Sequence, residues 1–363
     1  MQTNMDFALR PRSARSTAPP HARGRGINHL VPGRRVLITG VGSYFGTELA
    51  RRLEAEPEFE RIAGLDTRPP RAPLVRTEFV EADVRDPDLA RRLPAIRADT
   101  VVHNQIVRQP GRGISARAAH EINVIGTLQL LAACERAPGL EAVVVRGSAG
   151  VYGSEPSGPQ FFAEDMSGLR PARTRFQRDV IEIDSYFEAF SRRHPGITCT
   201  MLRYQPAIGP YVDSQVTRYL SMSLPPTYLG FDPRIQLVHE RDALEALVAA
   251  VKRPVEGAVN VAAPGTIGLT RMMRMVGKRT LPIPYPLFGP VVRTAERAGF
   301  GPLSVDLRRL LRYGRAVEVR RLVEEVGFTP RFTTEEAVRD YVRARTDPGY
   351  VAGAPEPRAV SAA

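Results

Sequence analysis

The sequence predicts an α/β fold, in which a doubly wound parallel sheet carries helices on both faces and a smaller C-terminal domain follows. Between residues 34 and 204, short β-branched apolar segments alternate with longer segments of helical periodicity. A glycine-rich segment follows the first apolar segment, and beyond residue 209 the alternation gives way to proline-rich stretches. Strands that alternate with helices form parallel sheets with both faces covered. With 363 residues, 43% of them hydrophobic, the chain can build one large core or two.

The individual elements follow from the period of the apolar residues. Buried strands are expected at residues 34–39, 61–66, 77–84, 100–103, 141–148 and 198–204. Helices are expected at 45–54, 115–136 and 176–191, and in the C-terminal part near 240–252, 305–313, 317–327 and 334–345. The helix at 176–191 carries an apolar stripe of Phe176, Val180, Ile183, Phe187 and Phe190.

The charge of the chain is large but local. Its 51 Lys and Arg residues face 39 Asp and Glu residues, for a formal net charge of +12, and nearly all of this surplus falls in residues 1–35 and 293–321. The basic N-terminal arm leaves association with nucleic acid open as a lesser alternative. The central body is almost neutral and has no groove-reading motif, so nucleic acid is not an expected partner. Residues 1–32 and 347–363 are expected to be disordered tails, the first of them basic. Lys252 and Lys278 are the only lysines.

Other features indicate a cytoplasmic protein. No run of about 18 apolar residues predicts a membrane span, and the N-terminal stretch lacks the apolar core of a secretory signal. Cys134 and Cys199 lie far apart in apolar surroundings, which is typical of free thiols in a reducing compartment. Their spacing does not fit a metal site, and no metal is expected.

The glycine-rich segment predicts a dinucleotide-binding turn. It runs from the end of the first strand into a helix, where glycines let the backbone approach a pyrophosphate and the helix N-terminus supplies N–H donors. About 20 residues later Asp66 ends the second strand, where a carboxylate can accept the ribose hydroxyls of an adenosine. Asp66 would repel a 2′-phosphate, which favours NAD over NADP, although the nearby Arg68 softens this preference. A purely structural turn is the alternative. The residues of the turn are Thr39, Gly40, Val41, Gly42, Ser43, Tyr44, Phe45 and Gly46.

On these residues the chain resembles the extended short-chain dehydrogenase/reductase family, in its NAD-dependent epimerase/dehydratase branch around UDP-glucose 4-epimerase. The resemblance spans residues 34–345 and implies a Rossmann domain at 33–208 plus about 235–263, with a substrate domain at 209–234 and 264–346. The turn resembles the family's TGxxGxxG, with Ser43 in place of the middle glycine. Further cofactor contacts implied by the resemblance are Asp83 and Val84, which match the adenine-contacting segment, and His103, which matches the start of the VVHxAA strand end.

The resemblance also implies catalytic residues, and here the sequence departs from the family. Ser148 matches the catalytic serine, and Asn123 matches the asparagine that orders water and backbone around the site. The Tyr-x-x-x-Lys pair is replaced by Phe176 and Val180, which carry neither a proton to exchange nor a charge. Since Val248 and Arg274 stand four residues before the two lysines, the pair exists nowhere in the chain.

If the protein is an enzyme, another residue near Phe176 has to act as the base. Asp179 lies about 60° around the helix from Phe176 and is a candidate base, or else a solvated or salt-bridged carboxylate. Asn104, Gln105 and Ile106 stand where the family has small alanines beside the cofactor, which would narrow that space.

Two functions remain open at this point. The first is an NAD-dependent nucleotide-sugar epimerase or dehydratase with an altered catalytic set. The second is a catalytically inactive protein that binds NAD or a nucleotide sugar and acts as a regulator or partner. The family's dimers also predict a homodimer that buries the apolar stripe of the helix at 176–191.

Overall fold

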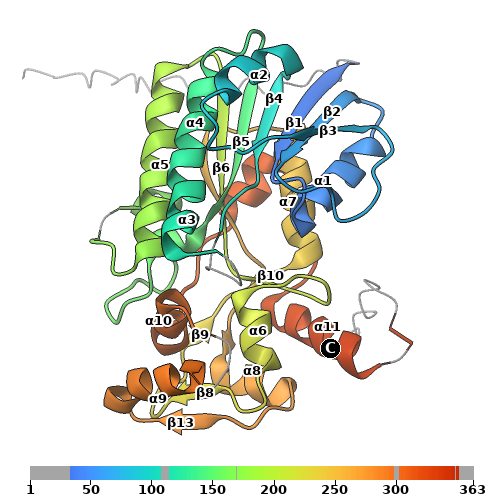
Figure 1. Ribbon diagram of the computed structural model, residues 1–363. Helices are drawn as coiled ribbons and strands as arrows, with labels where there is room; N and C mark the ends of the chain where they lie inside the picture. Colours follow the sequence, from blue (N-terminus) through green and yellow to red (C-terminus); the bar gives the residue numbers. More distant parts are fainter. Residues whose placement is uncertain (1–32, 108–113, 169, 298–301, 348, 351–363) are drawn as a thin grey trace, which may run out of the picture.

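The computed structural model describes residues 33–107, 114–168, 170–297, 302–347 and 349–350 (Figure 1). The predicted tail at 1–32, and all of the tail at 347–363 except 347 and 349–350, lie outside these residues. A parallel seven-stranded sheet forms the centre, and the predicted fold class is confirmed. Its strands, from edge to edge, are β3 (Thr77–Glu81), β2 (Phe59–Asp66), β1 (Arg34–Thr39), β4 (Thr100–His103), β5 (Ala142–Ser148), β6 (Thr198–Tyr204) and β11 (Gly257–Val261).

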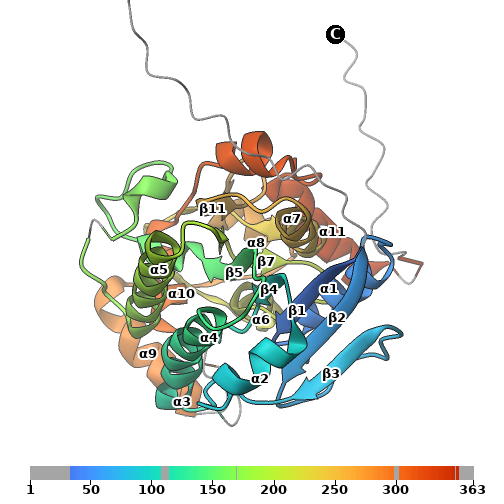
Figure 2. The same cartoon turned by 90° about the horizontal axis from the view of Figure 1, so that it is seen from above.

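Helices cover both faces of the sheet (Figure 2). Alternate residues of each central strand point to opposite faces, so Val36 and Ile38 of β1 enter one core while Leu37 enters the other. The first core is completed by α1 (Tyr44–Glu54) and α7 (Glu240–Lys252). The second is completed by α2 (Leu89–Ile96), α4 (Gly126–Cys134) and α5 (Arg175–Arg193).

The C-terminal part lies against the end of the sheet at which the strands finish (Figure 1). It has its own core, to which Tyr219, Met272, Phe288, Leu310 and Tyr341 contribute. Its helices are α6 (Gln215–Ser221), α8 (Leu269–Met275), α9 (Tyr285–Arg297), α10 (Val305–Tyr313) and α11 (Thr334–Thr346). Two-stranded pairings tie it together: β13 (Leu281–Ile283) with β8 (Pro226–Tyr228), β12 (Ile267–Gly268) with β9 (Arg234–Ile235), and β10 (Val238–His239) with β7 (Ala207–Ile208).

Two predicted helices differ in the structure. The segment 115–136 is α3 (Ala116–His120) and α4 joined by a π-helical turn at Glu121–Ile125, and Asn123 lies in that turn. The segment 317–327 is helical only over 320–326, mainly as a π-helical turn at Leu322–Val326, because its beginning is extended and Val317 forms a bridge with Phe162.

The apolar stripe of α5 is already buried within one chain, which corrects the prediction that a second copy covers it. Val180, Ile183, Phe187 and Phe190 are each no more than 2% exposed. Three of them pack in the core beneath α4 and α5, and Val180 packs in a smaller apolar cluster.

Two further findings concern the described residues alone. None of their helices combines the length and the apolar character that a membrane span requires. Their His, Cys, Asp and Glu side chains form no group of three or more that could hold a metal ion.

Candidate active site

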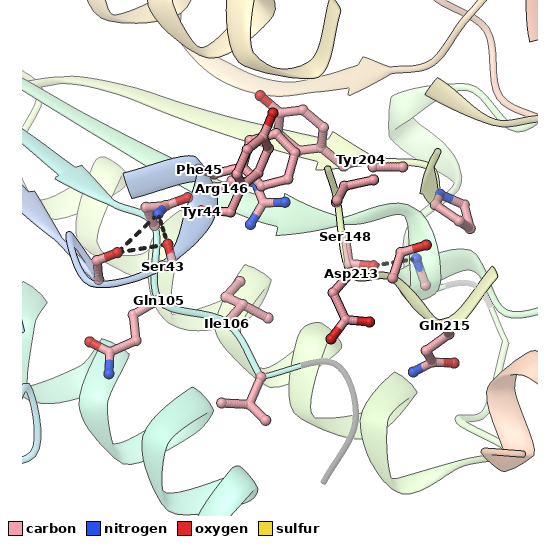
Figure 3. A pocket seen from close by; sticks show the side chains of 18 of the residues that line it. Ser43, Tyr44, Phe45, Gln105, Ile106, Arg146, Ser148, Tyr204, Asp213 and Gln215 are labelled. Atoms are coloured by element: carbon pink, nitrogen blue, oxygen red, sulfur yellow. Dashed lines mark hydrogen bonds between the residues drawn. The ribbon is translucent and has the colours of Figure 1, made fainter. Parts of the chain in front are cut away.

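A cavity of about 580 Å³ lies where the strands of the sheet end and the C-terminal part begins (Figure 3). One wall is built by the turn between β1 and α1 and by the segments that follow β2, β4 and β5. Residues of α6 and α10 close the opposite side. In Figure 3, Ser43 and Gln105 lie on one side of the cavity, and Ser148 and Gln215 on the other. Six residues of the predicted site line it: Gly40, Ser43, Tyr44, Phe45, Asp66 and Ser148.

The glycine-rich turn presents backbone donors to this cavity. Ser43 is the N-cap of α1: its hydroxyl accepts from the Gly46 N–H at 3.0 Å and donates to the Gly40 carbonyl at 2.7 Å. The N–H groups of Tyr44 and Phe45, the first two of the helix, have no intrahelical acceptor and none among the other described residues. These two donors and the positive end of the helix dipole make the turn fit for an anion such as a pyrophosphate.

Gly46 permits the tight contact between this turn and its helix. A Cβ atom there would lie 2.1 Å from the Gly40 oxygen and 2.7 Å from the Val41 Cα. Gly40 has a φ of 72°, a backbone conformation that residues other than glycine rarely adopt. Both glycines are therefore required by the shape of the turn.

Asp66 lies at the end of β2 with its carboxylate beside the turn. Its Oδ2 accepts from the Gly42 N–H at 3.0 Å and its Oδ1 from the Arg68 N–H at 3.2 Å. Oδ1 also accepts from the Thr67 hydroxyl at 3.4 Å, so Oδ2 is the oxygen with a second lone pair for a further hydroxyl donor. This arrangement suits the ribose hydroxyls of an adenosine at the same cavity edge.

Two predicted cofactor contacts, Asp83 and Val84, do not line the cavity. Asp83 pairs with Arg85 at 2.6 Å, and the hydrogen bonds from that guanidinium lower the pKa of the Asp83 carboxyl. Val84 is fully buried and packs against Gly126. Their contact with a bound adenine stays a prediction.

The predicted residues Thr39 and His103 lie beneath the turn. The Thr39 hydroxyl is 2.8 Å from His103 Nδ1, and the Thr127 hydroxyl is 3.0 Å from His103 Nε2. All three side chains are fully buried. The imidazole, carried by β4, therefore joins β1 to α4 and supports the cavity wall from behind.

His103 makes the stability of the fold depend on pH. Burial lowers the pKa of this imidazole from 6.5 to about 4. As the pH falls from 6.5 to 4, the unfolded chain binds a proton that the folded chain refuses, so the free energy of unfolding falls by about 3 kcal/mol. Urea unfolding of the protein and of His103→Gln across this range measures the effect. Between pH 6.5 and 4 the free energy of unfolding of the variant is expected to decrease less than that of the unmodified protein. Equal decreases would show that His103 is not the source of this pH dependence.

Ser148 and Phe176 meet at the inner end of the cavity. The Ser148 hydroxyl accepts from the Gly150 N–H at 3.1 Å and lines the cavity, and so does the Phe176 ring. A Cβ atom at Gly150 would lie 2.9 Å from that ring, so the phenyl group lies directly over the segment that follows the serine. Val180, in the lysine position, does not line the cavity and packs instead with Val151 and Phe162.

The remaining predicted catalytic residues are turned away from the cavity. Asn123 is fully buried, and its side chain donates to the Val107 carbonyl at 2.9 Å and accepts from the Val107 N–H at 2.7 Å. It thereby holds the segment after β4. Asp179 lies outside the cavity wall, 2.8 Å from His120 Nδ1. Of the two interpretations left open for Asp179, the geometry favours the paired carboxylate, and it is not retained as a candidate base.

Two arginines of the cavity are not among the predicted site residues. Arg146 on β5 and Arg315 after α10 both line it, and burial lowers the pKa of each to about 10, which leaves both charged at neutral pH. A signal for Arg146 was present, because it is the one charged residue in the segment 142–148 and directly follows four apolar residues. Arg315 had no such signal, because it stands among many other arginines.

Sheet order, turn and cavity together define the class of protein. A parallel sheet with a glycine-rich turn after β1, an acid at the end of β2 and a serine at the end of β5 is the arrangement of an extended short-chain dehydrogenase/reductase. The model of the NAD dependent epimerase/dehydratase family matches residues 36–262. The chain belongs to this family.

Relatives and solved structures agree with this assignment. A protein of Mycobacterium tuberculosis described as uncharacterized is 38% identical over 316 residues, which cover 85% of this chain and 84% of the relative. UDP-glucose 4-epimerase 3 of rice, Oryza sativa, is 26% identical over 208 residues, which cover 52% of this chain and 53% of the rice protein. The dTDP-glucose 4,6-dehydratase of Bacillus anthracis, solved with NAD, superposes with a TM-score of 0.64 at 16% identity, covering 87% of this chain and 98% of that one. The structure of MoeE5 with UDP-glucuronic acid and NAD superposes with a TM-score of 0.65 at 20% identity, covering 86% of this chain and 98% of MoeE5.

Proposed function

We propose that this protein binds NAD and a nucleotide sugar in the cavity and acts on a sugar hydroxyl as an epimerase/dehydratase-type oxidoreductase. One observation carries the proposal: the two N–H groups at the start of α1, the Asp66 carboxylate and the Ser148 hydroxyl face a single cavity. The two N–H groups fit a diphosphate, the Asp66 carboxylate fits a ribose, and the Ser148 hydroxyl fits the reacting hydroxyl of a sugar. Similar solved structures carry NAD with UDP-glucose or UDP-glucuronic acid.

NAD is proposed over NADP. The Asp66 carboxylate stands where it would repel a 2′-phosphate. Arg68 and Arg71 also line this edge of the cavity and weaken that preference. When bound, the nicotinamide would accept and return a hydride.

The residues of this chain would divide the remaining work. Ser148 would hold the sugar hydroxyl, and Asn123 would keep the segment after β4 in place through both of its bonds to Val107. Phe176 cannot take the proton of that hydroxyl. Asp306 replaces Asp179 as the candidate base: it lines the cavity, burial raises the pKa of its carboxyl, and Thr174, next to the start of α5, donates a hydrogen bond to it.

The second function is a binding protein without turnover. It is favoured by the replacement of the tyrosine by Phe176 and by the position of Val180 in an apolar cluster away from the cavity. The two functions share the same bound ligands and differ only in turnover.

Ser148→Ala separates the two functions. The protein is loaded with NAD, whose binding is measured by calorimetry, and is then given UDP-glucose, UDP-galactose and their uronic acids. If the protein is an enzyme, turnover of at least one sugar is expected, and the variant should lose about 100-fold in rate while it still binds NAD. Ser223→Ala, at an exposed position outside the cavity, is the matched control. NAD binding without turnover of any of these sugars would favour the binding protein.

We further propose that the protein forms a homodimer and is located in the cytoplasm. Because the stripe of α5 is internal, the contact surface is proposed on the outer face of the helices at 116–134, where Ile125 and Leu128 are 39% and 40% exposed. Light scattering after gel filtration tests the dimer. The buried free thiols of Cys134 and Cys199 suit a reducing compartment.

A further inference from the structure

Arg146 is a buried cation without a counter-ion. Its side chain enters the cavity from the last part of β5, and the residue is only 8% exposed. Among the described residues, no carboxylate lies within ion-pair distance of Arg146 and no acceptor bonds to its guanidinium, whose Nε is buried without a partner. A charge removed from water in this way is costly unless a partner of opposite sign arrives.

Two aromatic rings hold the guanidinium in place. Its central carbon lies 4.0 Å from the centre of the Phe45 ring and 5.2 Å from the centre of the Tyr204 ring. Such contacts orient a guanidinium and offset part of its desolvation, but they leave its N–H donors unused. Figure 3 shows the head of Arg146 below these rings, directed toward the open centre of the cavity.

The neighbouring carboxylates of the cavity are already engaged. Asp66 accepts from the backbone, Asp213 pairs with Arg218, and Asp306 accepts from Thr174. Five arginines and three aspartates line the cavity, which leaves it a surplus of two positive charges. A cavity of this charge favours an anionic ligand.

The position of Arg146 specifies where the anion would lie. Arg146 and Ser148 are two residues apart on β5, so both point to the same face of the sheet, and both line the cavity. Arg146 also contacts Phe45, whose N–H is one of the two open donors at the start of α1. An oxyanion between these groups would meet a guanidinium, a helix N-terminus and a hydroxyl.

We propose that Arg146 is a ligand-binding residue that takes a phosphate or carboxylate group at the inner end of the cavity, beside Ser148. This inference rests on the proposed function for the identity of the ligand. The group would come either from the diphosphate of a dinucleotide or from the carboxylate of a nucleotide-linked uronic acid. In both cases the planar guanidinium would bind the two oxygens side by side.

Arg146→Met and Arg146→Lys test the proposal by calorimetric titration of the purified full chain. The probes are inorganic pyrophosphate, NAD, UDP-glucose and UDP-glucuronic acid. Arg146→Met is expected to weaken anion binding by about 10- to 100-fold, and Arg146→Lys by less, because it keeps the charge. A loss confined to UDP-glucuronic acid assigns the carboxylate, and a loss for pyrophosphate and NAD assigns the diphosphate.

Thermal melting of the ligand-free variants provides a second readout. Since Arg146→Met removes an uncompensated buried charge, its melting temperature is expected to rise by about 2–4 °C while binding weakens. Arg91→Met, the same change at an exposed arginine, is the control and should alter neither property. Unchanged affinities for every probe, or a lower melting temperature of both Arg146→Met and Arg146→Gln, would overturn the proposal and make Arg146 structural.

The proposed function and this inference fail in different ways. If the wild-type protein binds NAD and Arg146→Met binds it and the other probes equally well, the inference fails and the proposed function stands. If the wild-type protein binds no NAD but binds pyrophosphate or UDP-glucuronic acid through Arg146, the NAD-dependent function fails and the anion site stands.

Discussion

Gly46→Ala is expected to lower the affinity for NAD at least about tenfold and to destabilise the fold. The added Cβ would lie 2.1 Å from the Gly40 oxygen and 2.7 Å from the Val41 Cα. Both are backbone atoms, so no side chain can move aside and the turn itself must shift. A forced backbone shift in a packed site costs about 1–3 kcal/mol or more. The shift would also displace the N–H groups of Tyr44 and Phe45 from a bound diphosphate.

Calorimetric NAD binding and urea unfolding measure the two effects of Gly46→Ala. Gly196→Ala is the matched control, since no atom lies within 4 Å of the added Cβ and its φ is not in the left-handed region. The control should leave both values within error of the wild type. A Gly46→Ala protein that matches the control in affinity and stability would show that the turn is looser than the structure describes.

Asp184→Ala is expected to destabilise the protein by about 3–5 kcal/mol, because it leaves the Arg203 guanidinium buried and unpaired. The Arg203 Nη2 and Asp184 Oδ2 atoms are 2.6 Å apart, and the two side chains are 2% and 7% exposed. Arg203 also donates to the Tyr152 hydroxyl at 2.9 Å and to the Glu164 carbonyl at 2.6 Å. These neutral acceptors cannot replace the lost carboxylate.

A double variant isolates the contribution of this charge pair. Asp184→Leu with Arg203→Met removes both charges and keeps most of the volume, so it is expected to be more stable than Asp184→Ala in urea unfolding. Arg117→Met, at an exposed arginine, is the control for a loss of positive charge. If Asp184→Ala lost less than about 1 kcal/mol, like an exposed ion pair, the buried pair would not hold this part of the fold together.

Gly46 could be identified from the sequence, whereas the ion pair of Arg203 and Asp184 could not. Gly46 stands in a pattern that predicts a turn, so its importance could be inferred from the order of residue types alone. The pair of Arg203 and Asp184 joins β6 to α5, 19 residues apart in the chain, and no local pattern links them. Charge pairs of this kind depend on the packing of a helix on a sheet.

The predicted elements show the same difference. The sheet strands at 34–39, 100–103 and 198–204 have the predicted bounds, because each is built around a short run of β-branched and apolar residues, as buried parallel strands are. The helix at 89–96 was not predicted, since it contains Pro94 and two arginines and its apolar face is only two leucines wide. The segment at 317–327 has a helical pattern, but the bridge between Val317 and Phe162 holds its start extended.

Residue types along the chain are enough to infer the parallel sheet, the glycine-rich turn with Asp66, the serine at the end of β5 and the loss of the Tyr-x-x-x-Lys pair. Each of these follows from the residue types within one segment or from the regular interval between successive segments, such as the 20 residues from Gly46 to Asp66. Packing in three dimensions determines that Asp179 pairs with His120 outside the cavity, that the stripe of α5 is internal, and that Arg146 faces the cavity without a counter-ion among the described residues. These outcomes depend on which distant segments share a face, and that is settled by the packing of whole elements rather than by the pattern within any one of them.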